Sequence, residues 1–165
     1  MVGTQSILVE SRIIKTVFQI FDRLGLKVYI HYNNKKLLTG IMQHLGVENN
    51  LINEVLLCLS KIDKIGADGV KEGLLIKGMT EGMILKLFHF IEEEFSFRRF
   101  EASFNDNLRE GIAEIKELQV YLSKLDLIAK TELNLYLTEG LSINTDMMYE
   151  VSLVDQNIAS GMSET

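Results

Sequence analysis

The apolar residues of this chain repeat with two different periods, and this change of period restricts the fold more than any other feature. Over residues 9–24, 37–45, 52–62, 80–91 and 108–125 they recur every three or four positions, which is typical of amphipathic helices. Over 28–32, 133–137 and 147–153 they occupy alternate positions, which predicts strands. The absence of proline from all 165 residues favours helices that end at glycine or asparagine.

The positions of these segments predict an α+β fold, with antiparallel strands from both chain ends and a mostly helical segment between them. We expect 133–137 and 147–153 to pair with each other as antiparallel neighbours. Because helices separate the strand-forming ends, we expect two domains. Residues 1–46 and 127–165 would form the sheet domain, and 47–126 would form a helical insertion.

The composition, with 47% hydrophobic and 24% charged residues, is that of a globular protein. No apolar run approaches the ~18 residues of a membrane span, so we expect no membrane association. The first ten residues lack a basic start and a long apolar stretch, and the single Cys58 cannot form an internal disulfide. A cytoplasmic location fits these features best.

Charge is distributed unevenly along the chain. Residues 1–46 hold six Lys/Arg and two Asp/Glu, a net charge of +4. Residues 47–126 hold ten and fifteen, and residues 127–165 hold one and six, so each of these parts carries −5. This distribution argues against nucleic-acid binding over the whole surface.

The sequence offers no metal site, because His31, His44 and His89 have no partner at metal-ligand spacing. Cys58 lies in an apolar helix and is expected to be a small core residue. The phenylalanines between 88 and 104 flank Arg98 and Arg99, a pattern that can stack on single-stranded bases. Three consecutive glutamates at 92–94 precede the two arginines, so the local charge is not positive. We therefore expect the phenylalanines to pack in the core or at a helix–helix corner.

Three segments in register carry a resemblance to a known family. They are RLGLKVYIHYNNKKLLTGI (residues 23–41), LSKIDKIGADGV (59–70) and KTELNLYLTEGL…MYEVSLVD (130–155). Together they resemble histidyl-tRNA synthetase, a class II aminoacyl-tRNA synthetase, in its bacterial form. The resemblance implies part of a class II catalytic core and an insertion domain that contacts the tRNA acceptor stem. It also implies ATP with Mg²⁺, histidine and tRNA as ligands, and a homodimer.

The sequence differs from that family in the motifs that bind histidine and the α-phosphate in the family. The family's histidine motif reads R-G-L-D-Y-Y-T-G, of which Gly140, Leu141 and Thr145 match, and these three are the expected remnant of the substrate site. Glu139 stands at the arginine position, and a carboxylate opposes the negative charge that this arginine stabilises on the α-phosphate. Where the family's next strand has three consecutive glycines, this chain has Ser163, Glu164 and Thr165. We therefore predict no catalytic residue, no retained cofactor and no aminoacylation by this chain itself.

RNA contact is the one activity that the insertion could retain. Lys61, Asp63 and Lys64 match a similar stretch of the family's insertion domain, although a solvated helix end explains the same residues. The candidate tRNA contacts are Lys61 and Lys64, joined by Lys35 and Lys36 if the basic head packs beside them. So few phosphate contacts predict weak binding.

Two other interpretations stay open on the sequence alone. The chain could be a non-catalytic binding or regulatory paralogue, similar in kind to the regulatory subunit of ATP phosphoribosyltransferase. It could also be a gene fragment whose product folds.

Overall fold

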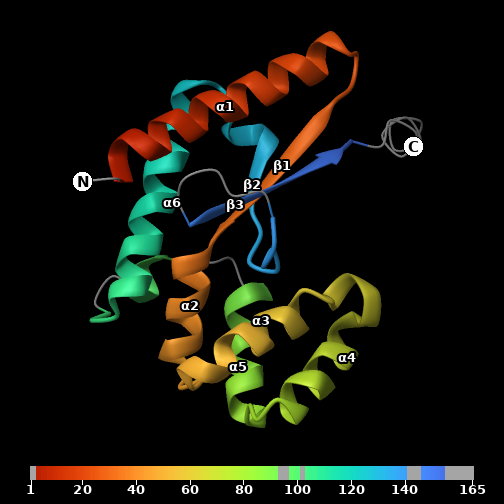
Figure 1. Ribbon diagram of the computed structural model, residues 1–165, viewed down its shortest axis with the longest axis vertical. Helices are drawn as coiled ribbons and strands as arrows, with labels where there is room; N and C mark the ends of the chain where they lie inside the picture. The colour runs from red at the N-terminus through yellow and green to blue at the C-terminus, as the bar shows by residue number, and fades with distance from the viewer. Residues whose placement is uncertain (1–2, 93–96, 101–102, 141–145, 155–165) are drawn as a thin grey trace.

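The computed structural model describes residues 3–92, 97–100, 103–140 and 146–154, and its arrangement of helices around a small sheet confirms the α+β class (Figure 1). The elements in chain order are α1 (Gly3–Arg23), β1 (Val28–Asn34), α2 (Lys35–His44), η1 (Asn49–Leu51), α3 (Ile52–Leu59), α4 (Ile62–Ile76), α5 (Glu81–Glu92), η2 (Phe97–Phe100), α6 (Asp106–Lys124), η3 (Ile128–Lys130), β2 (Thr131–Leu133) and β3 (Met147–Leu153). In this part of the chain, no helix combines the length and the hydropathy that crossing a membrane requires.

The described strands form one three-stranded sheet in the order β2-β1-β3. Strand β1 runs parallel to β2, with Ile30 opposite Thr131, and antiparallel to β3, with Val28 opposite Leu153. The predicted direct pairing of 133–137 with 147–153 is therefore wrong, because β1 lies between these two segments. The second predicted strand, 133–137, is also misplaced, because the observed β2 ends at Leu133 and shares only this residue with it.

One face of the sheet lies beneath α1 and α6. Val28 and Tyr32 are buried on this face, and the Tyr32 hydroxyl accepts a hydrogen bond from Nε2 of Gln119 in α6 at 2.9 Å. The Tyr149 hydroxyl of β3 donates to Oε2 of the buried Glu10 in α1 at 2.7 Å. These polar contacts fix both helices over the sheet.

The opposite face, which we call the open face, carries a row of three titratable residues. His31 of β1 stands opposite Glu132 of β2 and opposite Glu150 of β3. Since directly opposed residues of neighbouring strands point to the same side, the three side chains share this face.

Helices α2 and α6 approach each other closely at two glycines. A Cβ atom on Gly40 would lie 2.6 Å from the backbone nitrogen of Leu108. A Cβ atom on Gly111 would lie 2.5 Å from the backbone nitrogen of Leu37. Both distances are too short for carbon, so this packing requires residues without a side chain.

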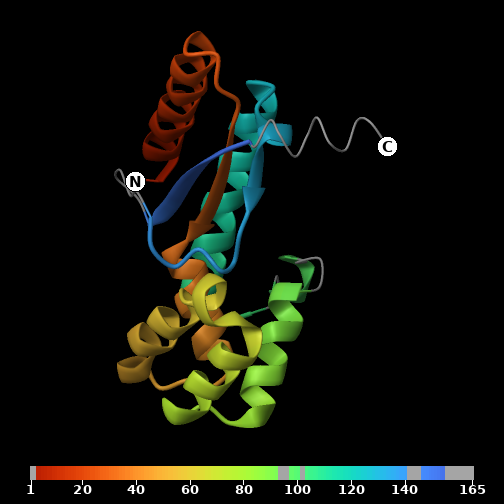
Figure 2. The same cartoon turned by 90° about the vertical axis from the view of Figure 1, so that its right-hand side faces the viewer.

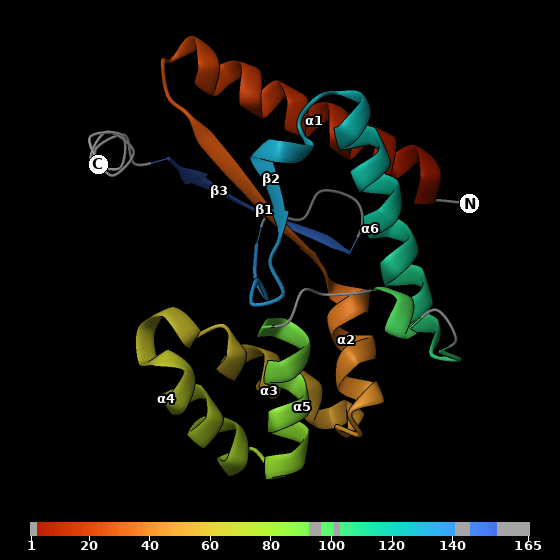
Figure 3. The same ribbon diagram turned by 180° about the vertical axis from the view of Figure 1, so that it is seen from behind.

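Helix α6 shows the predicted apolar stripe, and its main contacts are with α1, α2 and β1 (Figure 3). Of the stripe, all residues but the half-buried Leu125 are buried: Leu108, Ile112, Ile115, Leu118 and Leu122. The predicted domain division assigns α6 to the insertion and stays a prediction. In space α6 forms part of the layer over the sheet.

Helices α3, α4 and α5, which we call the helical block (residues 52–92), gather at one end of the molecule (Figure 2). Local signals place several helix ends as expected, but the predicted helix over 52–62 is divided, because α3 ends at Leu59 and α4 begins at Ile62. Gly25 and Gly46 follow α1 and α2 with φ of +72° and +88°, and Asn34 caps α2 by accepting from the backbone nitrogen of Leu37 at 3.1 Å. Gly66, with φ of +73°, kinks α4.

Candidate functional site

Two cavities lie beside the segment that follows β2, and two of the candidate tRNA contacts, Lys61 and Lys64, line one of them. This cavity, which we call the α3–α4 cavity, has a volume of about 520 Å³. The turn between α3 and α4 forms one side, and the segment after β2 with Glu150 forms the other. Its lining residues are Leu57, Ser60, Lys61, Ile62, Asp63, Lys64, Asn134, Tyr136, Leu137, Thr138, Glu139 and Glu150.

The segment 134–139 is held by hydrogen bonds within the fold. The carbonyl of Leu137 accepts from Nδ2 of the buried Asn33 at 2.9 Å, and the Asn134 side chain accepts from the backbone nitrogen of Tyr136 at 3.0 Å. The Thr138 hydroxyl oxygen is buried in this segment and has no hydrogen-bond partner among the described residues. The backbone that forms one wall of the cavity is therefore fixed by the fold.

Carboxylates outnumber cations in the α3–α4 cavity. Lys61 and Lys64 are exposed and face Asp63, Glu139 and Glu150. A triphosphate needs a surplus of positive charge or of backbone donors at its oxygens. The charge of this cavity therefore does not fit ATP. The described residues also contain no group of histidine, cysteine or carboxylate side chains that could hold a metal ion.

The other candidate lysines lie at the start of α2 and have different surroundings. Nζ of Lys36 lies 2.8 Å from Glu114 Oε1, 3.2 Å from Glu110 Oε2 and 3.5 Å from Asp146 Oδ2. The hydrogen bond to Glu114 is the largest cause that raises the pKa of Lys36 above its ordinary value. Lys35 is exposed. Neither lysine lines the α3–α4 cavity with Lys61 and Lys64.

The predicted remnant of the substrate site is described only in part. Gly140 packs against β3, where an added Cβ would lie 2.7 Å from the carbonyl oxygen of Tyr149. This close approach is a structural reason for glycine at the position. Leu141 and Thr145 lie outside the described residues.

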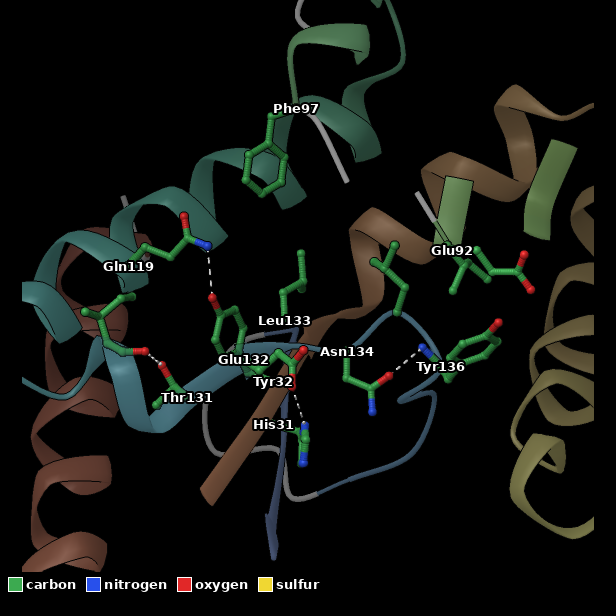
Figure 4. A pocket seen from close by; sticks show the side chains of 13 residues that line it. His31, Tyr32, Glu92, Phe97, Gln119, Thr131, Glu132, Leu133, Asn134 and Tyr136 are labelled. Atoms are coloured by element: carbon green, nitrogen blue, oxygen red, sulfur yellow. Dashed lines mark hydrogen bonds and ion pairs between the residues drawn. The ribbon is translucent and has the colours of Figure 1, made fainter. Parts of the chain in front are cut away.

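A second cavity, which we call the β2 cavity, was not predicted from the sequence (Figure 4). It has a volume of about 710 Å³ and shares Asn134 and Tyr136 with the α3–α4 cavity. Strand β2, the end of α5 and one side of α6 line it, with His31, Tyr32, Ile91, Glu92, Phe97, Gln119, Ile128, Thr131, Glu132, Leu133, Asn134, Leu135 and Tyr136. The alternation of 28–32 places His31 on the open face, but no local pattern predicts that β2 ends early enough to leave a cavity.

His44 and Cys58 make packing contacts within the fold. The His44 ring packs edge-on against Phe100, with 5.4 Å between ring centroids. The thiol of the buried Cys58 points to the Val70 carbonyl at 3.7 Å, which agrees with the predicted core position. Phe88 and Phe100 are buried, so the predicted packing role of the phenylalanine cluster is confirmed for these two.

Comparison with known proteins places these features in a family context. No family model matches the chain. It is 37% identical over 98% of its length to histidine–tRNA ligase 1 of Bacillus thuringiensis subsp. konkukian, and 36% identical to that of Bacillus anthracis. The chain spans 39% of the length of both relatives.

A solved structure shares the fold. The crystal structure of histidyl-tRNA synthetase from Nostoc sp. PCC 7120 matches 92% of this chain and 38% of its own, with a TM-score of 0.82 at 20% sequence identity. The resemblance to histidyl-tRNA synthetase is confirmed for this part of the family's length.

Proposed function

We propose that this chain, a partial relative of histidine–tRNA ligases, does not activate histidine by itself and retains a weak contact with tRNA. Histidine and tRNA are the molecules that the relatives' names specify. The class II type of core and the homodimer come from the same resemblance, and the cytoplasmic location comes from the composition and the single cysteine. The observation that carries the proposal is the position of Glu139, which lines the α3–α4 cavity where the resemblance places the phosphate-binding arginine.

The charges around Glu139 support the loss of nucleotide chemistry. Glu150 and Asp63 line the same cavity, so a phosphate that entered it would meet three carboxylates. Two lysines of this cavity cannot turn the local field positive. An activated transition state that carries negative charge would therefore be disfavoured in it.

ATP–pyrophosphate exchange tests the first half of the proposal. We expect the purified chain, freed of host synthetase, to show no histidine-dependent exchange above a control without protein. The full-length ligase of Bacillus anthracis serves as the positive control for the assay. Exchange that rises in proportion to the amount of this chain would contradict the proposal.

The tRNA contact rests on Lys61 and Lys64. Both lysines are exposed and line the α3–α4 cavity. Lys36, in contrast, forms ion pairs with three carboxylates and is less available to a phosphate. Contacts to so few phosphates give dissociation constants of about 10⁻⁴–10⁻⁶ M at physiological salt, and weaker ones as salt rises.

Fluorescence anisotropy with histidine-specific tRNA measures this contact. We expect Lys61→Glu with Lys64→Glu to weaken binding at low salt. Lys15→Glu with Lys86→Glu makes the same change in net charge at exposed positions of α1 and α5, and should have less effect. Nanomolar binding that neither pair of substitutions changes would contradict the assignment, as would the absence of binding at low salt.

A specific observation favours the second candidate function, a non-catalytic binding module. The β2 cavity is larger than the α3–α4 cavity, and the predicted catalytic motif contributes no residue to it. A ligand could occupy it without any histidine or nucleotide chemistry.

A further inference from the structure

The β2 cavity exists because strand β2 ends after three residues. The backbone nitrogen of Asn134 still donates to the Tyr32 carbonyl at 2.9 Å, and the chain then turns away at Tyr136. No described strand covers the outer edge of β2. The cavity lies along this outer edge, with Tyr32 and Gln119 on the side of α6 and with His31 and Glu132 on the open face.

About half of the residues that line this cavity are aromatic or aliphatic. Leu133 lies near its centre, with Phe97 on one side and Tyr136 on another (Figure 4). The Phe97 ring already attracts a cation, since Nζ of Lys116 lies 5.7 Å from its centroid. Aromatic faces of this kind favour positively charged groups.

The charged groups that line the cavity are carboxylates. Glu132 and Glu92 come from different elements, and no lysine or arginine belongs to the lining. Among the described residues, neither carboxylate forms an ion pair with a lysine or an arginine. Oε2 of Glu132 lies 3.8 Å from His31 Nδ1, which is too far for a hydrogen bond, and Nδ1 has no hydrogen-bond partner among these residues.

The tyrosines around the cavity respond to this negative charge. Burial raises the pKa of Tyr136, and the charge of Glu92 raises it further. Burial likewise raises the pKa of Tyr29 and of Tyr32, with a further contribution from Glu132 in each case. The three phenols therefore stay protonated at neutral pH, and the acidic side chains that line the cavity are Glu92 and Glu132.

We propose that the β2 cavity binds a small organic cation, a protonated primary amine with an apolar body. Glu132 would hold the ammonium group, while Leu133, Phe97 and Tyr136 contact the body. Binding of such an amine rests on the second candidate function and specifies its ligand class, whereas neither the loss of histidine activation nor the tRNA contact involves this cavity. Since Glu132 is exposed, the ion pair contributes modestly and the affinity should be in the millimolar range.

Three phenyl compounds of similar shape test the sign of the charge. Phenethylamine, phenethyl alcohol and 3-phenylpropionate are titrated into the isotopically labelled chain and followed by two-dimensional NMR. We expect the amine to shift the side-chain amide signals of Gln119, which line the cavity, and the anion to leave them unchanged. Equal shifts with all three compounds, or no shift with millimolar amine, would overturn the proposal.

A matched pair of substitutions tests whether Glu132 is the carboxylate that holds the ammonium group. Glu132 and Glu150 stand on the two sides of His31 on the open face, but only Glu132 lines the β2 cavity. We expect Glu132→Gln to weaken amine binding about three- to fivefold, and Glu150→Gln to leave it unchanged. Equal losses in both variants, with the fold intact by circular dichroism, would overturn the proposal. The result is independent of exchange activity and of tRNA affinity, so each proposal can fail alone.

Discussion

At the scale of single residues, neighbouring carboxylates change what a lysine does in this protein. Lys35 and Lys36 are adjacent and identical in chemistry, and the sequence predicts the same RNA contact for both. In the fold, Lys36 lies between Glu114 and Glu110 of α6 and Asp146 before β3, whereas the Lys35 side chain is exposed. Lys36 therefore connects three segments that are distant in sequence, and we interpret it as a structural residue.

The first prediction compares the two lysines. We expect Lys36→Met to lower the free energy of unfolding by about 1–2 kcal/mol, because it leaves the partly buried Glu114 without its cation. Lys35→Met should change it by less than about 0.5 kcal/mol. Urea unfolding at neutral pH measures both values. Equal effects of the two substitutions would show that the carboxylates around Lys36 contribute nothing.

The dependence on pH follows from the raised pKa of Lys36. The fold favours the charged amine, so its stabilisation is complete below the ordinary lysine pKa of 10.5 and is lost as pH rises through the higher folded value. The difference between Lys36→Met and the unchanged chain should therefore stay constant through neutral pH. It should shrink only in strongly alkaline solution.

At the scale of elements, the sequence predicts where helices and strands lie better than it predicts their partners. The alternation at 28–32 and 147–153 indicates strands, and both are present. Alternation specifies which side chains share a face, but it carries no information on which strand lies beside which. The close approach of α2 and α6 was not predicted either, since Gly40 and Gly111 are unexceptional glycines in the sequence.

The second prediction concerns this helix pair. Gly111→Ala should lower the free energy of unfolding by about 1–3 kcal/mol, because its Cβ would push against the backbone of Leu37. Gly82→Ala in α5 is the control, since its nearest neighbour is the Thr80 hydroxyl at 3.9 Å. That change should be neutral or stabilise by up to about 1 kcal/mol through helix propensity. Thermal or urea unfolding measures the free energy of unfolding of both variants. A Gly111→Ala protein as stable as the original would contradict the packing argument.

At the scale of the whole molecule, the candidate site illustrates a limit of sequence reasoning. Glu139 follows Lys61 and Lys64 by more than seventy residues. The resemblance assigns Glu139 to the histidine motif and the two lysines to the insertion domain, so the sequence does not predict that they meet. The fold brings them to one cavity because the turn between α3 and α4 faces the segment after β2. The β2 cavity depends on where a strand ends, which is a tertiary property without a local signature.

The buried apolar residues form one core cluster, but the contacts between helices and strands are not evenly distributed over the molecule. The most extensive contacts between elements are those of β1 with β3 and β2 and of α6 with α2 and α1, all in or next to the sheet. The helices of the block contact mainly one another. We therefore expect the block to open locally at a lower free energy than the sheet and α6.

The last prediction tests this difference with two core substitutions of similar size. Ile115 in α6 and Leu59 in α3 are both fully buried, so replacement by alanine should cost about 2–5 kcal/mol in either place. Ile115→Ala should reduce hydrogen-exchange protection throughout the chain, because α6 contacts α1, α2 and β1. Leu59→Ala should reduce it mainly in residues 52–92 and leave the amides of β1 better protected. If both variants lose protection uniformly, the chain unfolds as one cooperative unit, and the helical block has no separate opening.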